Sequence, residues 1–213
     1  MFLILGIAAI IIGYLLGAIP TAYIIAKLRK GIDIRDVDVR NMGGGSVLRQ
    51  VGIWEGILVI VVDVAKGAAA ILIAQAMGIS LPWVLGAGLA AILGHNYPVY
   101  VRFRGGQGVA TLQGVFLVIT PLALIIPYGL MGIILLITRR KFIHILFLAV
   151  CVMAPLLPIC VWLFYRSEML LYYTLVIVGF LLFKNRHRLK ELKALKLKTN
   201  KERKNITTDN KTG

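Results

Sequence analysis

The chain has 213 residues, of which 59% are hydrophobic and 15% are charged. Soluble domains carry roughly 45–50% apolar and about 25% charged residues, so this composition excludes an ordinary soluble protein and indicates a chain that lies in lipid. The formal net charge of +15 could suit a nucleic-acid partner. No nucleic-acid motif or aromatic interleaving accompanies the charge, however, so no nucleic-acid partner is expected.

Long apolar runs predict membrane-spanning helices, because a span needs about 20 consecutive apolar residues. One further stretch, 109–138, is apolar but interrupted by Pro121 and Pro127, so it is too short for two full spans and long for one. The sequence therefore predicts an all-α integral membrane protein. In chain order, its continuous runs cover residues 2–26, 52–77, 83–101, 142–164 and 168–183.

Basic clusters decide the predicted topology, because Lys and Arg gather in cytoplasmic loops. The clusters lie at 27–49, 102–104, 139–141 and 184–204. If all four face the cytoplasm, the stretch 109–138 must leave and return, which predicts a hairpin of two short helices that turns near Pro121. The result is about seven transmembrane helices with the N-terminus outside. A six-helix alternative, with 109–138 as one long tilted span, would place the cluster at 139–141 outside.

The predicted topology divides the chain into two regions. Residues 1–183 form a polytopic membrane domain. Residues 184–213 form a basic tail with eleven Lys or Arg and three Asp or Glu residues, which we expect in the cytoplasm. Such a tail also favours contact with anionic membrane lipids.

The first place that could carry chemistry is the segment 40–49, with the sequence RNMGGGSVLR. Its three glycines, Gly43, Gly44 and Gly45, precede Ser46 and would let backbone N–H groups approach a phosphate closely. Arg40 and Arg49 flank them and could each bind a phosphate with two hydrogen bonds. A flexible loop with lipid-facing arginines explains the same composition equally well.

The second place is the segment 94–111, with the sequence GHNYPVYVRFRGGQGVAT. Arg102 and Arg104 precede Gly105, Gly106 and Gly108, and we expect a helix to start directly afterwards. A glycine turn that leads into a helix N-terminus is a ready anion site. His95 lies at the end of the preceding span. A single histidine there is more often a structural hydrogen-bonding residue than a catalyst, but its position opposite the glycine turn makes catalysis a serious alternative.

The third place is a charged pair, Asp63 and Lys66, near the middle of the second apolar run. A charge at that depth costs about 2.5–3.5 kcal/mol on insertion scales. The i, i+3 spacing puts both side chains on one helix face, where they can pair. We expect the pair to face the bundle interior rather than the lipid surface. A path through a small transporter or channel is the competing explanation.

Together these features predict two loops, rich in glycine and arginine, that bind a phosphorylated ligand at the cytoplasmic membrane face. The apolar bundle around them would suit a lipid or an acyl chain. The sequence shows no metal-ligand cluster and no nucleophile elbow, so neither a metal nor an organic cofactor is expected. Any reaction would then depend on positioning and charge stabilisation.

The segment 94–111 resembles the second motif of the bacterial PlsY family, the acyl-phosphate:glycerol-3-phosphate acyltransferases. The segments IPTAYIIAKLRKGIDIR, NMGGGSVLR, VVDVAKG and RHR are similar, in this order, to further conserved stretches of that family. The resemblance implies a seven-helix protein of the bacterial cell membrane. It also implies transfer of a fatty acyl group from acyl-phosphate to the sn-1 hydroxyl of glycerol 3-phosphate, which gives lysophosphatidic acid and phosphate for phospholipid synthesis.

The resemblance also assigns roles to individual residues. It implies catalytic roles for Asn41, Arg49 and His95. It implies substrate or phosphate binding by Gly43, Gly105, Gly106, Gly108, Thr111 and His187. The composition of the two loops adds Arg40, Gly44, Gly45, Ser46 and Arg104 to the predicted phosphate-binding residues.

Several positions depart from the family pattern. Asp38 and Arg40 stand where the first motif has glycines, and Gly45 and Ser46 stand where it has threonine and asparagine. Val39 stands where the family has the serine of its first motif, and Gln107 stands where it has a lysine. Lys190 stands where the third motif has an asparagine. One interpretation is an active enzyme in which a neighbouring cation, such as Arg40 or Arg104, replaces the lysine. The other is a non-catalytic relative that still binds a phosphorylated lipid precursor.

Overall fold

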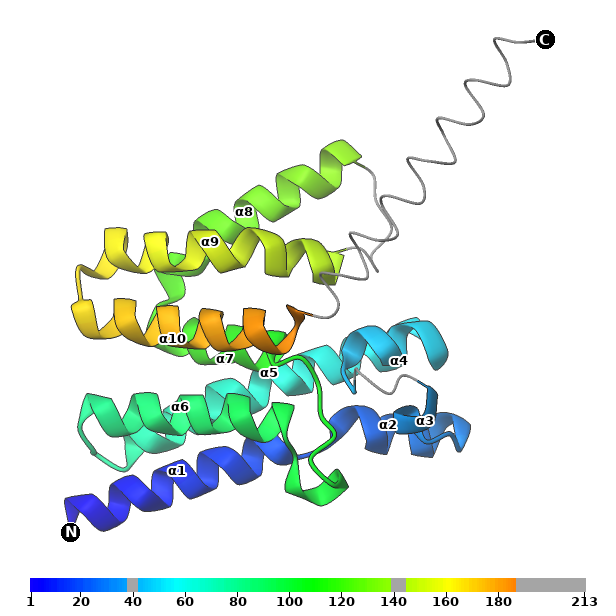
Figure 1. Cartoon of the computed structure of the whole chain (residues 1–213), viewed down its shortest axis with the longest axis horizontal. Helices are drawn as coiled ribbons and strands as arrows, with labels where there is room; N and C mark the ends of the chain where they lie inside the picture. The colour runs from blue at the N-terminus through cyan, green and yellow to red at the C-terminus, as the bar shows by residue number, and fades with distance from the viewer. Residues whose placement is uncertain (38–41, 139–144, 187–213) are drawn as a thin grey trace, which may run out of the picture.

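The computed structural model describes residues 1–37, 42–138 and 145–186, and the regular structure in these ranges is helical. Figure 1 shows most of the long helices running alongside one another as a bundle. The elements are α1 (Phe2–Ala18), α2 (Thr21–Lys30), α3 (Ile34–Val37), α4 (Gly44–Gln50), α5 (Ile53–Ala76), α6 (Leu81–Asn96), a 3₁₀ turn (Val99–Val101), α7 (Val109–Ile119), α8 (Pro121–Thr138), α9 (Ile145–Tyr165) and α10 (Glu168–Lys184).

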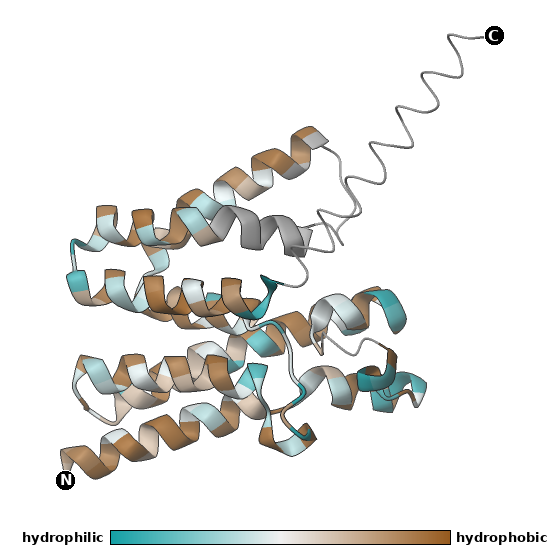
Figure 2. Ribbon diagram, in the orientation of Figure 1, coloured by the Kyte–Doolittle hydropathy of each residue, from teal (hydrophilic) through white to brown (hydrophobic). Residues whose placement is uncertain are grey.

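The described basic segments lie at one end of the bundle. The N-terminus lies at the opposite end, whereas α2, α3, α4, the loop before α7 and the last turn of α10 share the basic end (Figure 1). Figure 2 shows hydrophobic colour along the long helices and hydrophilic colour concentrated at this same end. This arrangement agrees with the predicted one-sided charge. The clusters at 139–141 and 187–204 lie outside the described residues.

Among the described residues, three helical stretches are long and apolar enough to cross a membrane, namely Phe2–Lys30, Ile53–Ala76 and Leu81–Val101. The prediction of an integral membrane protein made of helices is therefore confirmed, while the count of seven spans stays a prediction. The expected turn near Pro121 is present, because α7 ends at Ile119 and α8 begins at Pro121. Val109–Ile119 and Pro121–Ile134 are both shorter apolar helical stretches, as predicted, although α8 as a whole has 18 residues against 11 in α7.

Two other boundaries differ from the prediction. The first apolar run is not one helix, because the chain breaks at Ile19 and Pro20 and resumes as α2, which Gly31 ends in the left-handed conformation. The polar, glycine-rich segment 27–50 between the first two apolar runs was expected to be a loop, but its described residues are largely helical. The glycine-rich part of this segment forms α4, which packs against α5. The packing is so close at Gly44 that a Cβ there would lie 2.3 Å from the Ile60 side chain.

Candidate active site

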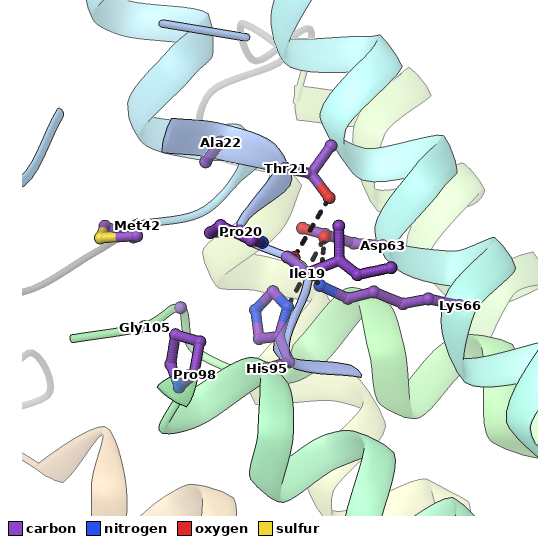
Figure 3. Close-up of a pocket in the computed structure, with 11 residues that line it drawn as sticks. Ile19, Pro20, Thr21, Ala22, Met42, Asp63, Lys66, His95, Pro98 and Gly105 are labelled. Carbon is purple, nitrogen blue, oxygen red and sulfur yellow. Dashed lines mark hydrogen bonds and ion pairs between the residues drawn. The ribbon is translucent and has the colours of Figure 1, made fainter. Parts of the chain in front are cut away.

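A small pocket lies at the basic end of the bundle, where the chain breaks between α1 and α2 (Figure 3). Charged and imidazole groups from α5 and α6 form one wall, and the glycine turn before α7 forms another. The three polar places that the sequence identified therefore meet in one region. The lining residues are Ile19, Pro20, Thr21, Ala22, Met42, Asp63, Lys66, His95, Pro98, Gly105 and Gly106.

Asp63 and Lys66 form a buried ion pair on α5. Lys66 Nζ lies 2.8 Å from Asp63 Oδ1, and the two side chains are only 6% and 3% exposed. Lys66 Nζ also donates a hydrogen bond of 3.2 Å to the carbonyl oxygen of Ile19. That carbonyl belongs to the end of α1, where helical backbone acceptors lack partners within the helix. The pair thus lies in the bundle interior, as expected, and ties α5 to the break between α1 and α2.

His95, the second-last residue of α6, lies between the carboxylate of Asp63 and the glycine turn (Figure 3). Its Nδ1 is 3.6 Å from Asp63 Oδ1, a distance of ion-pair contact rather than of a good hydrogen bond. Its Nε2 faces Gly106, where a Cβ would lie only 2.1 Å from that nitrogen. The backbone N–H of Gly106 donates to the carbonyl oxygen of His95 at 3.0 Å. The turn can approach the imidazole this closely only because residue 106 is glycine.

The two glycine segments contact each other directly. The backbone N–H of Met42 donates to the carbonyl oxygen of Gly105 at 3.3 Å. Gly43 precedes α4, and the residues that follow it, from Gly44 to Ser46, are buried at the start of that helix. Their role in α4 is packing against α5 rather than forming an open loop. Of the residues that this segment was predicted to contribute, Arg40 and Asn41 lie outside the described residues.

The remaining predicted site residues fall into three sets: two that are buried, two that are exposed and one that lies outside the described residues. Gly108 has a left-handed φ of 78° and precedes α7, which begins at Val109 as expected. Thr111 is fully buried in α7. Its backbone packs closely against α5, since a Cβ on Gly67 of α5 would lie 2.2 Å from the carbonyl oxygen of Thr111. Arg49 and Arg104 are exposed and are not among the residues that line the pocket. His187 lies outside the described residues.

The structure adds residues that the sequence did not identify as part of the site. Lys184, the last residue of α10, donates from Nζ to the carbonyl oxygen of Asn96 at 2.7 Å. Asn96 is fully buried and follows His95 directly. The sequence assigned Lys184 to the tail, although a basic residue that ends an apolar helix was a usable signal for a contact at the membrane face.

Comparison with known proteins identifies relatives along nearly the whole chain. The sequence model of the family "Glycerol-3-phosphate acyltransferase" matches residues 7–195. A glycerol-3-phosphate acyltransferase of Geotalea daltonii is 36% identical over 188 residues, which are 88% of this chain and 94% of that protein. Glycerol-3-phosphate acyltransferases 5 and 2 of Dehalococcoides mccartyi are 44% and 42% identical over 60% and 64% of this chain. Those two matches span only 53% and 65% of the relatives' own lengths.

The fold is similar to a solved membrane enzyme. The crystal structure of PlsY, an integral membrane glycerol 3-phosphate acyltransferase, in its glycerol 3-phosphate form superposes with a TM-score of 0.77 and 30% sequence identity. The match covers 89% of this chain and 92% of that one. A second structure of PlsY, in the lysophosphatidic acid form, gives a TM-score of 0.75 and 29% identity.

Proposed function

Because the chain belongs to the glycerol-3-phosphate acyltransferase family, we propose that it acylates the sn-1 hydroxyl of glycerol 3-phosphate. The acyl donor is acyl-phosphate, and the products are lysophosphatidic acid and inorganic phosphate. The single observation that carries the proposal is the meeting of His95, Gly106 and the Asp63–Lys66 pair in one pocket at the basic end of the bundle.

The chemistry suits a site that works by positioning. Acyl-phosphate is already activated, so the hydroxyl oxygen attacks the acyl carbonyl carbon and the bond between that carbon and the phosphate oxygen breaks. The phosphate leaves with the electron pair and carries the hydroxyl proton away. The site must hold two anions near each other, orient the hydroxyl and stabilise the oxyanion, all of which preorganised donors and cations can do.

Individual residues have distinct proposed roles. Gly105 and Gly106 let the backbone approach a phosphate. His95 orients the hydroxyl with its Nε2, which faces the glycine turn at Gly106. Asp63 and Lys66 position His95, since Asp63 Oδ1 contacts both Lys66 Nζ and His95 Nδ1. Among residues outside the described ranges, Asn41 shares the orienting role, and Arg40 and His187 bind phosphate.

The proposed location is the bacterial inner membrane, with the site and the tail 184–213 on the cytoplasmic side and the N-terminus outside. The distribution of charge supports this orientation, because the described clusters at 27–30, 102–104 and 184–186 lie at the end of the bundle that holds the site. A substrate made in the cytoplasm would reach the pocket directly, and the acyl chain would lie among apolar helices.

An assay of the purified full chain tests the activity. Acyl-phosphate and glycerol 3-phosphate are supplied together, and both phosphate release and lysophosphatidic acid are measured. Gly106→Val should lower the rate by at least about 100-fold, which is about 2.7 kcal/mol, because the side chain would displace His95 from the turn. Gly179→Val, at an exposed site on α10, is the matched control and should keep the rate. No acyl transfer by the unaltered chain would refute the proposal.

The non-catalytic alternative rests on Val39 and Gln107, which stand where the family has serine and lysine. Gln107→Lys with Val39→Ser separates the two functions. A chain that gains activity only with these substitutions is a binding protein, whereas activity in the unaltered chain establishes an enzyme. The transporter alternative needs Asp63 and Lys66 to line a path, but the two side chains pair with each other, and Lys66 Nζ also donates to the carbonyl oxygen of Ile19.

A further inference from the structure

The last turn of α10 packs against the segment that carries the site, although the two are about 80 residues apart in the chain. Lys184 Nζ donates to the carbonyl oxygen of Asn96 at 2.7 Å, and the same ammonium lies 4.0 Å from the centre of the Tyr97 ring. Asn185 Nδ2 reaches the carbonyl oxygen of Gln107 at 3.5 Å, the long limit of a hydrogen bond. The end of α10 therefore contacts this segment both before and within the glycine turn.

The chemistry of these contacts favours a lysine. Asn96 is the last residue of α6, so its carbonyl lacks a partner within the helix and lies at the negative end of the helix dipole. A cation there gains both a charge-assisted hydrogen bond and a favourable field. The ring of Tyr97 adds a cation–π contact. Lys184 is half-buried, which limits screening of these interactions by water.

The neighbours of Asn96 transmit this contact to the site. His95 directly precedes Asn96, and its own carbonyl accepts the backbone N–H of Gly106 at 3.0 Å. The side chain of Asn96 lies against the other end of the turn, because a Cβ on Gly108 would be 2.8 Å from Asn96 Nδ2. Asn96 thus touches the turn through its side chain and is held by Lys184 through its backbone.

We infer that Lys184 is a positioning residue for acyl transfer, which keeps His95 and the glycine turn 105–108 in register through the carbonyl of Asn96. The inference rests on the proposed function, because the reaction it serves is the acyl transfer proposed above. Loss of the ammonium frees the end of α6, so a bound substrate is held in the reactive geometry for less of the time.

Lys30 provides a matched control. Its Nζ donates to the carbonyl oxygen of Gln50, the last residue of α4, at 2.8 Å. The bond has the same chemistry and nearly the same length as that of Lys184, but Lys30 does not line the pocket. Lys30→Met therefore removes a lysine–carbonyl bond away from the pocket, where the lysine is exposed, and Lys184→Met removes one beside the turn, where the lysine is half-buried.

Steady-state kinetics of the full chain form the first measurement. Lys184→Met should lower kcat/KM for glycerol 3-phosphate at least tenfold, mainly through kcat, because alignment fails after binding. Lys184→Arg should stay within about threefold of the unaltered chain, since arginine retains the charge and donors. Lys30→Met should change the rate less than twofold. An unchanged rate in Lys184→Met, or an equal loss in Lys30→Met, would overturn the inference.

A second measurement does not depend on activity. Gln107→Cys, in a chain whose Cys151 and Cys160 are replaced by alanine, reports the accessibility of the turn to a thiol reagent. Adding Lys184→Met should speed its modification at least fivefold, whereas adding Lys30→Met should not. If the unaltered chain shows no acyl transfer, the proposed function fails and this rate alone decides the positioning role. Equal rates in the two variants would refute it.

Discussion

The helices that build the site and the helices that follow them use glycine differently. Gly114 of α7 lies so close to α5 that a Cβ would be 1.9 Å from the carbonyl oxygen of Val64, and a Cβ on Gly17 of α1 would be 2.0 Å from that of Ala91 on α6. Gly129 of α8 and Gly179 of α10 are exposed, and no atom of the described residues would lie within 4 Å of a Cβ there.

This difference shows where the bundle holds its geometry. Small residues let membrane helices pack backbone to backbone, which fixes the distance between them. The pairs α5–α7 and α1–α6 are fixed in this way, and the pocket lies beside the middle of α5, at the ends of α1 and α6 and at the turn before α7. These contacts hold α5, which carries Asp63, against α7, and α6, which carries His95, against α1. Substitutions in the two groups of helices should accordingly differ in their effect on stability.

Breaking the buried ion pair should have the largest effect. Asp63→Ala leaves the Lys66 ammonium buried without its carboxylate partner, although it keeps its hydrogen bond to the carbonyl oxygen of Ile19, and should lower the free energy of unfolding by about 3–5 kcal/mol. Thermal unfolding in detergent measures the change. The double variant Asp63→Leu with Lys66→Leu should recover much of that stability, because it buries no charge, yet remain inactive. A fully stable Asp63→Ala chain would contradict the burial of the pair.

The apolar runs were sufficient to predict the long helices, because a span is recognised from composition alone. Asp63 and Lys66 could be paired from their spacing on one helix. The contact between His95 and Asp63 could not be predicted, since the two residues lie on different helices and only packing of α5 on α6 brings them together. The segment Gly43–Ser46 indicated a loop from its composition, but packing against α5 outweighed the low helix propensity of glycine. No residue near Lys184 in the sequence indicated that its ammonium would bind the carbonyl oxygen of Asn96, which lies 88 residues away.

Closing the gap between α5 and α7 should have the next largest effect. Gly114→Ala places a methyl group against the carbonyl oxygen of Val64, where backbone must move, and should lower the free energy of unfolding by about 1–3 kcal/mol. Gly179→Ala meets no described atom and should leave stability unchanged or raise it by up to about 1 kcal/mol through helix propensity. Parallel unfolding curves measure both variants. Equal losses in the two would show that close packing is not confined to the helices that build the site.

The smallest effect is expected at an ion pair outside both groups of helices. Arg35 donates from Nε to Asp33 Oδ1 at 2.9 Å, and the two side chains are 24% and 22% exposed. The hydrogen bond from Arg35 lowers the pKa of Asp33 from 3.8 to about 2. Because the pair is partly exposed to solvent, Asp33→Asn should cost less than about 1 kcal/mol at neutral pH.

The direction of its pH dependence follows from the lowered pKa. A carboxylate whose folded-state pKa lies below its unfolded value stabilises the fold fully above the unfolded pKa of 3.8, and that contribution is lost as the pH falls toward about 2. The difference in unfolding free energy between the unaltered chain and Asp33→Asn should therefore be constant from pH 7 to 5 and shrink between pH 4 and 2. A difference that grows with acidity would show that Arg35 does not stabilise the charged carboxylate. The Asp63–Lys66 pair, in contrast, is shielded from water, so its loss should dominate at neutral pH.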